Sequence, residues 1–373
     1  MYYSPQRIEQ IRQLMNSESI DALILTRHED VQYATGFQAP GWGIPVGCVI
    51  MPGLRPLLVL PESILGLTED ITSGVAVRGF PSPGPVAWTL HRPAAFWQRV
   101  LELLQEHRVD AKTIGIQLDH VSVNEYQMVR STLQRASLKN CSQLLYELRQ
   151  VKDSTEIAAI RNSVKIAEIG LRTALETVSP GRSNVEVSAE VESAMRTAGR
   201  QLTGLRATVM SCVDDLWREE PSYRVIRPDD MLVVEVTTRR AGYYAQMSRT
   251  LRMGELKEKQ SRLFRTAMAA LETIENMLVP ENEVRDAANS VRRLLDSIDG
   301  VAISGRLGSS IGLCVSEPPV ISPDERTPVR EGMVFSVGPV VRGPDREIAR
   351  VGELVLVTSD GAESLSTLLR ETM

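Results

Sequence analysis

Residues 308–318 read GSSIGLCVSEP, and this glycine- and serine-rich segment is the most informative stretch of the chain. Serines stand at positions 309 and 316, and the segment contains no histidine. The four histidines of the 373-residue chain all lie in its first third, at positions 28, 91, 107 and 120. The C-terminal part of this chain therefore cannot supply a histidine general base or a histidine ligand for a metal ion.

Three more informative segments flank residues 308–318, two before them in the sequence and one after them. Upstream are ELRQVKDSTE at 147–156, and DMLVVE at 230–235 followed by GYYAQMSRT at 242–250. Downstream, EGMVFSVGP at 331–339 is joined to RVGELVLV at 350–357. Glu235 lies in the middle of the apolar run MLVVEVTT, which reads as a strand. A carboxylate buried in such a strand is costly unless it is paired.

The part of the chain before residue 148 alternates between helical and strand-like patterns. The spacing of apolar residues predicts helices at 7–15, 95–107 and 124–134, and strands at 22–26, 47–51, 56–61 and 113–118. Such alternation is typical of a small α/β domain with a mostly covered sheet. We expect two domains, residues 1–148 and residues 149–373, because the length exceeds what one core usually serves.

The C-terminal part carries an internal echo. After a long helix predicted over 154–178, residues 178–196 (VSPGRSNVEVSAEVESAMR) resemble residues 277–295 (MLVPENEVRDAANSVRRLL). Each stretch is the end of a helix, a proline-containing turn and a second helix, and strands follow it. This repetition predicts a pseudo-twofold domain with helices packed on a curved antiparallel sheet. The alternative is that two helical hairpins share turn chemistry by chance.

Composition narrows the class of protein. Apolar residues make up 43% and charged residues 24%, as in ordinary globular domains, and the formal net charge of -5 gives no reason to expect nucleic acid or an anionic membrane as a partner. No apolar run is long enough to span a membrane, and the N-terminus lacks the apolar core of a secretory signal. The four cysteines are scattered, which suits a reducing cytoplasm.

The four segments, together with YATGF at 33–37, resemble the pita-bread family that includes creatinase and Xaa-Pro aminopeptidase. The resemblance covers nearly the whole chain. It implies an N-terminal creatinase-like α/β domain, a C-terminal pita-bread domain (α/β, or α+β, overall) and a homodimer. The GYY and RTL pieces look most like creatinase.

The family's aminopeptidases hold two divalent metals between two aspartates, one histidine and two glutamates, so the resemblance also implies where such ligands would stand. The corresponding positions in this sequence are Glu235, Gln246, Ser309, Gly338 and Gly352. One carboxylate out of five ligands cannot offset two dications, so we expect no metal and no other cofactor. The positions that correspond to creatinase's histidine and carboxylates are Arg218, Ser248 and Gly338, so creatine hydrolysis is not expected either.

The remaining polar residues are the candidates for the site. We expect catalytic roles for Glu235, Gln246 and Glu317, and substrate-binding roles for Arg350, Tyr243, Ser309, Ser316, Arg218 and Trp42. Several alternatives stay open: Glu235 could be an acid or base, or the ion-pair partner of Arg249 or Arg350, and Gln246 could bind a ligand or Glu235. Ser309 and Ser316 could simply fill space, Glu353 could have a supporting or surface role, and strand alternation lets only one of Tyr243 and Tyr244 face inward.

Two functions from different classes follow. The first is a metal-independent enzyme that breaks a C–N bond (amide, amidine or guanidino) in a small amino-acid-like substrate, or a related lyase or isomerase, with Glu235 as acid/base and Arg350 as a clamp for a carboxylate. The second is a catalytically inactive homologue that binds a protein or a ligand. A closed polar pocket of small-molecule size favours the enzyme, and an exposed apolar patch favours the binding module.

Overall fold

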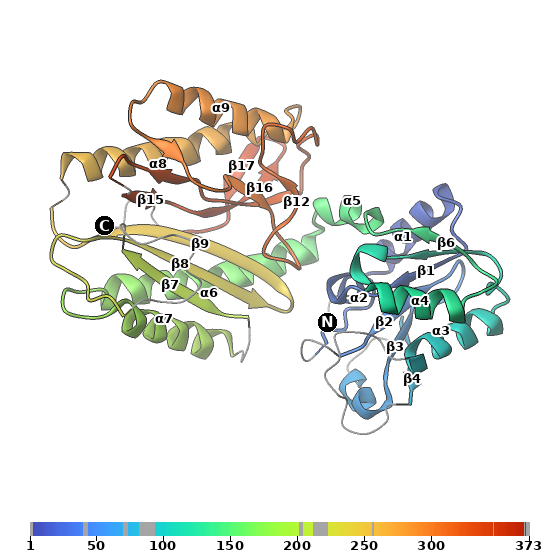
Figure 1. Cartoon of the computed structure of the whole chain (residues 1–373). Helices are drawn as coiled ribbons and strands as arrows, with labels where there is room; N and C mark the ends of the chain where they lie inside the picture. The colour runs from blue at the N-terminus through green and yellow to red at the C-terminus, as the bar shows by residue number, and fades with distance from the viewer. Residues whose placement is uncertain are drawn as a thin grey trace. The chain divides into compact units, whose positions relative to one another are not determined.

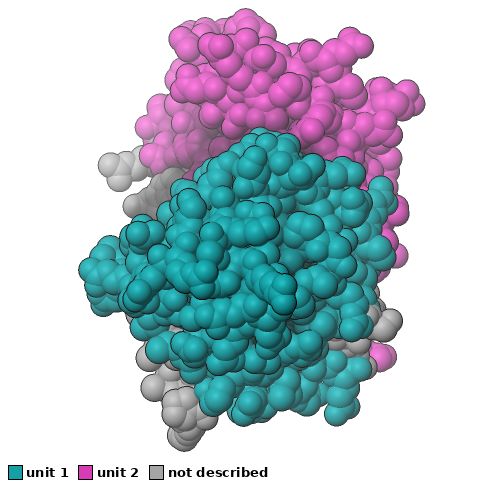
Figure 2. Space-filling model, turned by 90° about the vertical axis from the view of Figure 1, so that its right-hand side faces the viewer, with its two compact units in different colours: residues 1–149 teal, residues 150–373 magenta. Residues whose placement is uncertain are grey.

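The structure, a computed structural model, describes residues 3–39, 44–69, 74–81, 94–200, 204–211, 223–255, 257–345, 347–368 and 370. The chain separates into two compact units, residues 1–149 and 150–373, which Figure 2 draws in teal and magenta. None of the described helices is both long and apolar enough to cross a bilayer.

The first unit is built on one six-stranded mixed sheet in the order β4-β3-β2-β1-β5-β6. Its strands are β1 (Ala22–Leu25), β2 (Gly47–Ile50), β3 (Leu57–Pro61), β4 (Ala76–Phe80), β5 (Thr113–Ile116) and β6 (Ser137–Asn140). Its helices are α1 (Pro5–Ser17), α2 (His28–Thr35), α3 (Ala94–Glu106), α4 (Val123–Thr132) and α5 (Leu144–Gln150), the last of which lies at the boundary between the units. The sheet and α3 share a core that includes Phe96, Trp97 and Val59.

Most of these elements coincide with those that the hydrophobic periodicity predicts. The helices α2 and α5 and the strands β4 and β6 were not predicted. Both strands are short, and α2 spans only His28–Thr35 before Gly36 ends it in the left-handed conformation. Neither the strands nor this helix is long enough to show a clear period.

The second unit confirms the internal echo (Figure 1). Two helical hairpins, α6 (Ser154–Thr177) with α7 (Asn184–Gly199) and α8 (Glu258–Met277) with α9 (Val284–Asp296), have matching turns at residues 178–183 and 278–283. In both pairs the second helix begins with a capping box, formed by Ser183 and Glu186 in α7 and by Glu283 and Asp286 in α9. The repeated turn is therefore a repeated structure and not a coincidence of composition.

Antiparallel strands lie against these hairpins. They are β7 (Arg206–Ser211), β8 (Met231–Arg240), β9 (Tyr243–Arg252), β10 (Ala302–Ile303), β11 (Gly308–Ser310), β12 (Glu317–Val320), β13 (Val334–Val337), β14 (Val340–Arg342), β15 (Ile348–Arg350), β16 (Glu353–Thr358) and β17 (Gly361–Ser364). They form sheets in the orders β7-β8-β9, β10-β14-β15 and β12-β11-β13-β16-β17. α6 packs on β8 and β9, and α8 packs on β14 and β15. The predicted fold class, an α/β domain followed by a pita-bread domain, is confirmed.

A backbone bridge joins the two halves of the second unit. Ser248 on β9 and Gly352, directly before β16, exchange hydrogen bonds: Ser248 N donates to Gly352 O over 3.2 Å, and Gly352 N donates to Ser248 O over 2.9 Å. This bridge brings residues from β8 and β9 next to residues from β15 and the strands that follow.

Candidate active site

The first components of the site are Glu235 on β8 and Gln246 on β9, which lie on adjacent antiparallel strands. Gln246 Nε2 donates to Glu235 Oε1 over 3.0 Å. β8 is buried along most of its length, and its Glu235 side chain keeps 19% of its surface exposed. The Glu235 side chain is therefore partly exposed although its neighbours Val234 and Val236 on the strand are buried.

Arg350 on β15 completes a triad of side chains. Its Nη1 forms an ion pair with Glu235 Oε2, and its Nε donates to Gly338 O over 3.1 Å. Burial lowers the pKa of the Arg350 guanidinium to about 10, so the group is still a cation at neutral pH. Of the alternatives left open by the sequence, Arg350 is thus the ion-pair partner of Glu235, and Gln246 binds Glu235.

These side chains line a cavity of about 490 Å³, here called the Glu235 cavity. Alternate residues of β7 contribute to one wall, as expected when one face of a strand looks into a cavity. Its lining residues are Arg206, Thr208, Met210, Glu235, Gln246, Ser304, Gly305, Arg306, Gly308, Ser309, Val315, Ser316, Ser336, Gly338, Val340 and Arg350. A volume of this size suits a small molecule.

Five of the nine candidate residues meet in this cavity: Glu235, Gln246, Ser309, Ser316 and Arg350. Ser309 is 6% exposed, whereas Ser316 is at the surface and accepts a hydrogen bond from Arg306 Nη1 over 3.2 Å. Two further candidates, Trp42 and Arg218, lie outside the described residues.

The structure does not bring Glu317 and Tyr243 into the cavity. Glu317 is 3% exposed and accepts a hydrogen bond from Cys314 N over 2.9 Å. It also lies 3.8 Å from Nζ of Lys152. Tyr243 is 1% exposed, and its hydroxyl donates to Glu156 Oε1 over 3.1 Å. Both side chains therefore hold the interior of the second unit together.

Sequence reasoning missed several lining residues, of which those with polar side chains are Arg206, Thr208, Ser304, Arg306 and Ser336. Arg306 stands three positions before Ser309 in the segment GRLGS. Its closeness in sequence to residues 308–318 is the one feature that could have indicated a place in the site. Arg206 begins β7, and no local pattern connects it with Glu235.

Comparison with known proteins fits this architecture. The model of the creatinase/prolidase N-terminal domain matches residues 7–151, and that of metallopeptidase family M24 matches residues 158–359, more than half of the chain. The chain belongs to metallopeptidase family M24.

Similar M24 proteins and structures extend over the full length. The Xaa-Pro dipeptidase of Pyrococcus furiosus is 23% identical over 373 residues, covering 99% of both chains. The crystal structure of the prolidase from Pyrococcus horikoshii has a TM-score of 0.84 at 20% identity and covers 99% of this chain and 100% of that one. The N-terminal domain of the FACT complex subunit SPT16 from chickpea has a TM-score of 0.75 at 14% identity, over 98% of this chain and 97% of that one.

Gly338 and Gly352, the glycines for which the sequence resemblance predicts ligand positions, are closely surrounded. A Cβ atom at Gly338 would lie 3.1 Å from Arg350 Nε and 3.2 Å from its Nη2, so the guanidinium occupies the space that a longer side chain would need. A Cβ atom at Gly352 would collide with Ser248 Oγ. Within the described ranges, no group of three or more histidine, cysteine, aspartate or glutamate side chains is arranged to hold a metal ion.

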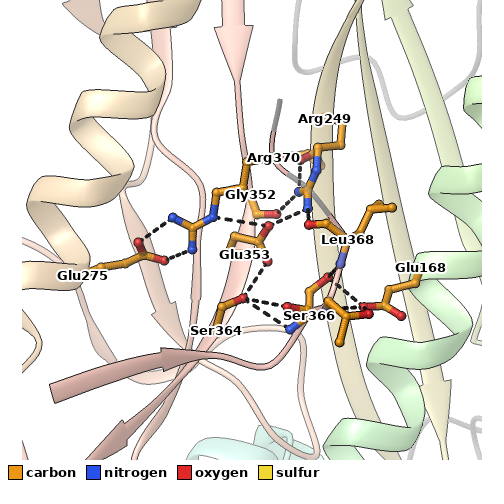
Figure 3. A network of polar contacts seen from close by, with 11 residues as sticks. Glu168, Arg249, Glu275, Gly352, Glu353, Ser364, Ser366, Leu368 and Arg370 are labelled. Carbon is orange, nitrogen blue, oxygen red and sulfur yellow. Dashed lines mark hydrogen bonds and ion pairs between the residues drawn. The ribbon is translucent and has the colours of Figure 1, made fainter. Parts of the chain in front are cut away.

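Glu353, which follows Gly352, is completely buried and belongs to a polar network (Figure 3). Arg249 on β9 donates to Glu353 Oε1 over 2.5 Å and to Leu368 O over 3.2 Å. Arg370 forms two hydrogen bonds with Glu275 on α8. Glu353 is therefore an interior residue bonded within this network and not a surface residue.

The same network holds the segment 364–370. Glu168 on α6 accepts hydrogen bonds from Ser366 Oγ over 2.9 Å and from Thr367 N over 2.6 Å. Because Arg370 contacts α8, this one segment is attached to a helix from each half of the pseudo-twofold domain.

Proposed function

We propose that this M24 chain is a metal-independent hydrolase that cleaves a C–N bond in a small amino-acid-like substrate. The observation that carries the proposal is the Glu235 carboxylate, which is held by Arg350 and Gln246 and exposed to a polar cavity of about 490 Å³. Family membership supports hydrolysis as the reaction class.

Independence from metal is proposed because the donor set does not fit a dinuclear centre. At the five positions that the resemblance assigns to ligands, Glu235 is the one carboxylate, and it is already paired with Arg350. The others are an amide, a hydroxyl and two glycines. Bridging carboxylates are needed to offset two dications, and Arg350 adds a third positive group to the same space.

The proposed chemistry assigns each side chain one task. Glu235 accepts a proton from a water molecule that attacks the carbon of the C–N bond, and then returns that proton to the leaving nitrogen, so that water is added across the bond. Gln246 and Arg350 fix the orientation of the carboxylate. Arg350 is therefore a positioning residue. It does not have the role of clamp for a substrate carboxylate that was assigned to it from the sequence.

The test is turnover of amino-acid amides, guanidino acids, cyclic amidines and Xaa-Pro dipeptides, with and without a chelator. We expect release of an amine or ammonia that the chelator leaves unchanged. Glu235→Gln should lower the rate by about 10²-fold or more, the usual contribution of a general acid/base. Glu363→Gln is the matched control, because Glu363 on β17 is exposed, pairs with Arg161 on α6 and is absent from the lining of the cavity.

Two results would overturn the proposal. One is full activity of Glu235→Gln, which would remove Glu235 from the reaction. The other is tightly bound stoichiometric metal, found by elemental analysis of the purified protein, with activity that is lost on chelation and restored by that metal.

A non-catalytic binding module is the alternative, and a second cavity favours it. This cavity of about 500 Å³ lies between α9 and the strands β10 and β12, and is mostly apolar, with Val291, Leu295 and Ile303 among its lining residues. A fold likeness to a subunit of the FACT complex is compatible with such a role. Wild-type biological activity in Glu235→Gln, and loss of it in a Leu295→Asp variant that keeps the wild-type melting temperature, would favour this reading over the hydrolase.

A further inference from the structure

The charge of the Glu235 cavity is opposite to that of the chain. Among the lining residues that the structure describes are three arginines, Arg206, Arg306 and Arg350, and one carboxylate, Glu235. The described part of the lining therefore carries a formal charge of +2, the three arginines minus the glutamate, whereas the whole chain carries -5. A concave site of one sign concentrates ligands of the other sign.

Arg350 and Arg306 differ in how many of their hydrogen-bond donors remain available to a ligand. Arg350 is the deeper one, and its guanidinium is committed to Glu235 and to the carbonyl of Gly338. Arg306 is exposed at the rim of the cavity, and its described hydrogen-bond partner is the hydroxyl of Ser316, a neutral group. A guanidinium bonded to a neutral hydroxyl keeps its charge and most of its donors for a ligand.

Apart from Glu235, Gln246 and Arg350, the most buried polar side chains of the cavity carry hydroxyls. Thr208, Ser309 and Ser336 line the cavity and are each at least nine-tenths buried. A hydroxyl can donate a hydrogen bond to an anionic oxygen without adding a charge to the site. The apolar side chains of Met210, Val315 and Val340 also line the cavity. The cavity thus presents a cationic rim, a hydroxyl-lined interior and one paired carboxylate.

We propose that the Glu235 cavity takes a small ligand with an anionic carboxylate or phosphate group, which is bound by Arg306 together with Ser316. The proposal rests on the proposed function in one respect, since it places the scissile C–N bond of that ligand next to Glu235. Arg306 is then the specificity residue of the site, in the role of clamp that the sequence assigned to Arg350.

Binding of anions is measured directly, by isothermal titration of the full chain with four probes at low and high salt. Glutarate and inorganic phosphate are the anionic probes, glutaramide is a neutral probe of similar size, and 1,5-diaminopentane is a cationic one. We expect saturable binding of at least one anionic probe, weakened by added salt because the rim is exposed, and no binding of the neutral or cationic probe. Glutarate alone would assign carboxylates as the ligand class, and phosphate alone would assign phosphate esters.

Arg306→Gln should weaken that binding by about tenfold or more, the effect of losing one charge-assisted hydrogen bond. Arg293→Gln is the matched control: Arg293 is also exposed and also donates to a serine hydroxyl, that of Ser290 over 2.7 Å, but it is absent from the lining of the cavity. Circular dichroism and the melting temperature without ligand show whether both variants fold as the wild type does.

Failure of this inference is separate from failure of the proposed function, because binding is measured without turnover. Equal binding of anionic, neutral and cationic probes, no binding of either anion, or unchanged anion binding in Arg306→Gln would each overturn it. Loss of turnover in Glu235→Gln would still support the hydrolase in those cases. Anion binding that depends on Arg306, in a protein that turns over none of the substrates, would support the proposed ligand class and contradict the proposed hydrolase activity.

Discussion

Arg249 and Glu353 form a fully buried ion pair, with 2.5 Å between Nη2 and Oε1 and 1% exposure of each side chain (Figure 3). Burial lowers the pKa of Arg249 and raises the pKa of Glu353, and the attraction between the two groups opposes both shifts. Each charge is therefore tolerated inside the second unit because the other is present.

Arg249→Met should lower the free energy of unfolding by about 3–5 kcal/mol, because it leaves the Glu353 carboxylate buried without its closest partner. The double variant Arg249→Met/Glu353→Leu should recover much of that loss, since no unpaired charge then remains. Urea unfolding followed by circular dichroism measures both. A double variant less stable than Arg249→Met would contradict this explanation.

Ser248→Ala should leave the free energy of unfolding unchanged or raise it, by about 3 kcal/mol at most. The Ser248 hydroxyl is buried and has no hydrogen-bond partner within the described residues, so its removal takes away a desolvated group that gains nothing from folding. Ser163→Ala is the control, because Ser163 Oγ donates to Tyr243 O over 2.8 Å and accepts from Arg240 N over 3.0 Å. Melting temperatures should move in opposite directions for the two variants.

Gly352→Ala should lower the free energy of unfolding by about 1–3 kcal/mol, the usual cost of adding a group to a filled site. The added Cβ atom collides with Ser248 Oγ and lies 3.1 Å from Ser248 N. Because Ser248→Ala removes the colliding oxygen, the double variant should be more stable than the sum of the two single changes. Additive effects in this double-mutant cycle would show that the contact between the two positions is not the cause.

Glu186 predicts a pH dependence of stability. Hydrogen bonds from the backbone N–H and the hydroxyl of Ser183, at 2.7 and 2.8 Å, lower the pKa of the Glu186 carboxyl. A lowered folded-state pKa gives stability that is present above the ordinary glutamate pKa of about 4.3 and is lost as the pH falls through the folded-state value.

The melting temperature of the wild type should therefore exceed that of Glu186→Gln at pH 6, and the difference should shrink as the pH falls toward 3. In a Ser183→Ala background the pH-dependent difference should be smaller, because one of the two donors is absent. A difference that is constant with pH would exclude this carboxylate as its source.

The sequence predicts the fold well because the fold depends on local patterns repeated along the chain. The α7 helix begins where a serine and a glutamate three residues later form a capping box, and the same device recurs at α9. The pairing in the site is different, since Glu235 could meet either of two arginines. The choice of Arg350 for Glu235 and of Arg249 for Glu353 depends on contacts between residues more than 100 positions apart, which no local pattern encodes.

Arg306 illustrates the same limit. Its type and position are plain in the sequence, but its role follows from the way the loop between β10 and β11 forms the rim of a cavity whose other walls come from β7, β8 and β15. Tyr243 shows a further limit. Strand alternation predicts that only one of Tyr243 and Tyr244 faces inward, but it does not say what lies on that side. In the structure the Tyr243 hydroxyl bonds to Glu156, and the residue is absent from the lining of the cavity.

The attachment of residues 366–370 to Glu168 and Glu275 has a consequence for synthesis on the ribosome. Unit 1 makes its contacts within the first 149 residues, so it can fold while the rest of the chain is still being translated. The second unit cannot close its network until Arg370 has left the exit tunnel, because that residue completes the pairing of a helix made about 100 residues earlier. Until then Arg249 lacks its contact with Leu368 O and Glu353 lacks its contact with Arg370, so the second unit completes this network only after residue 370 has been made.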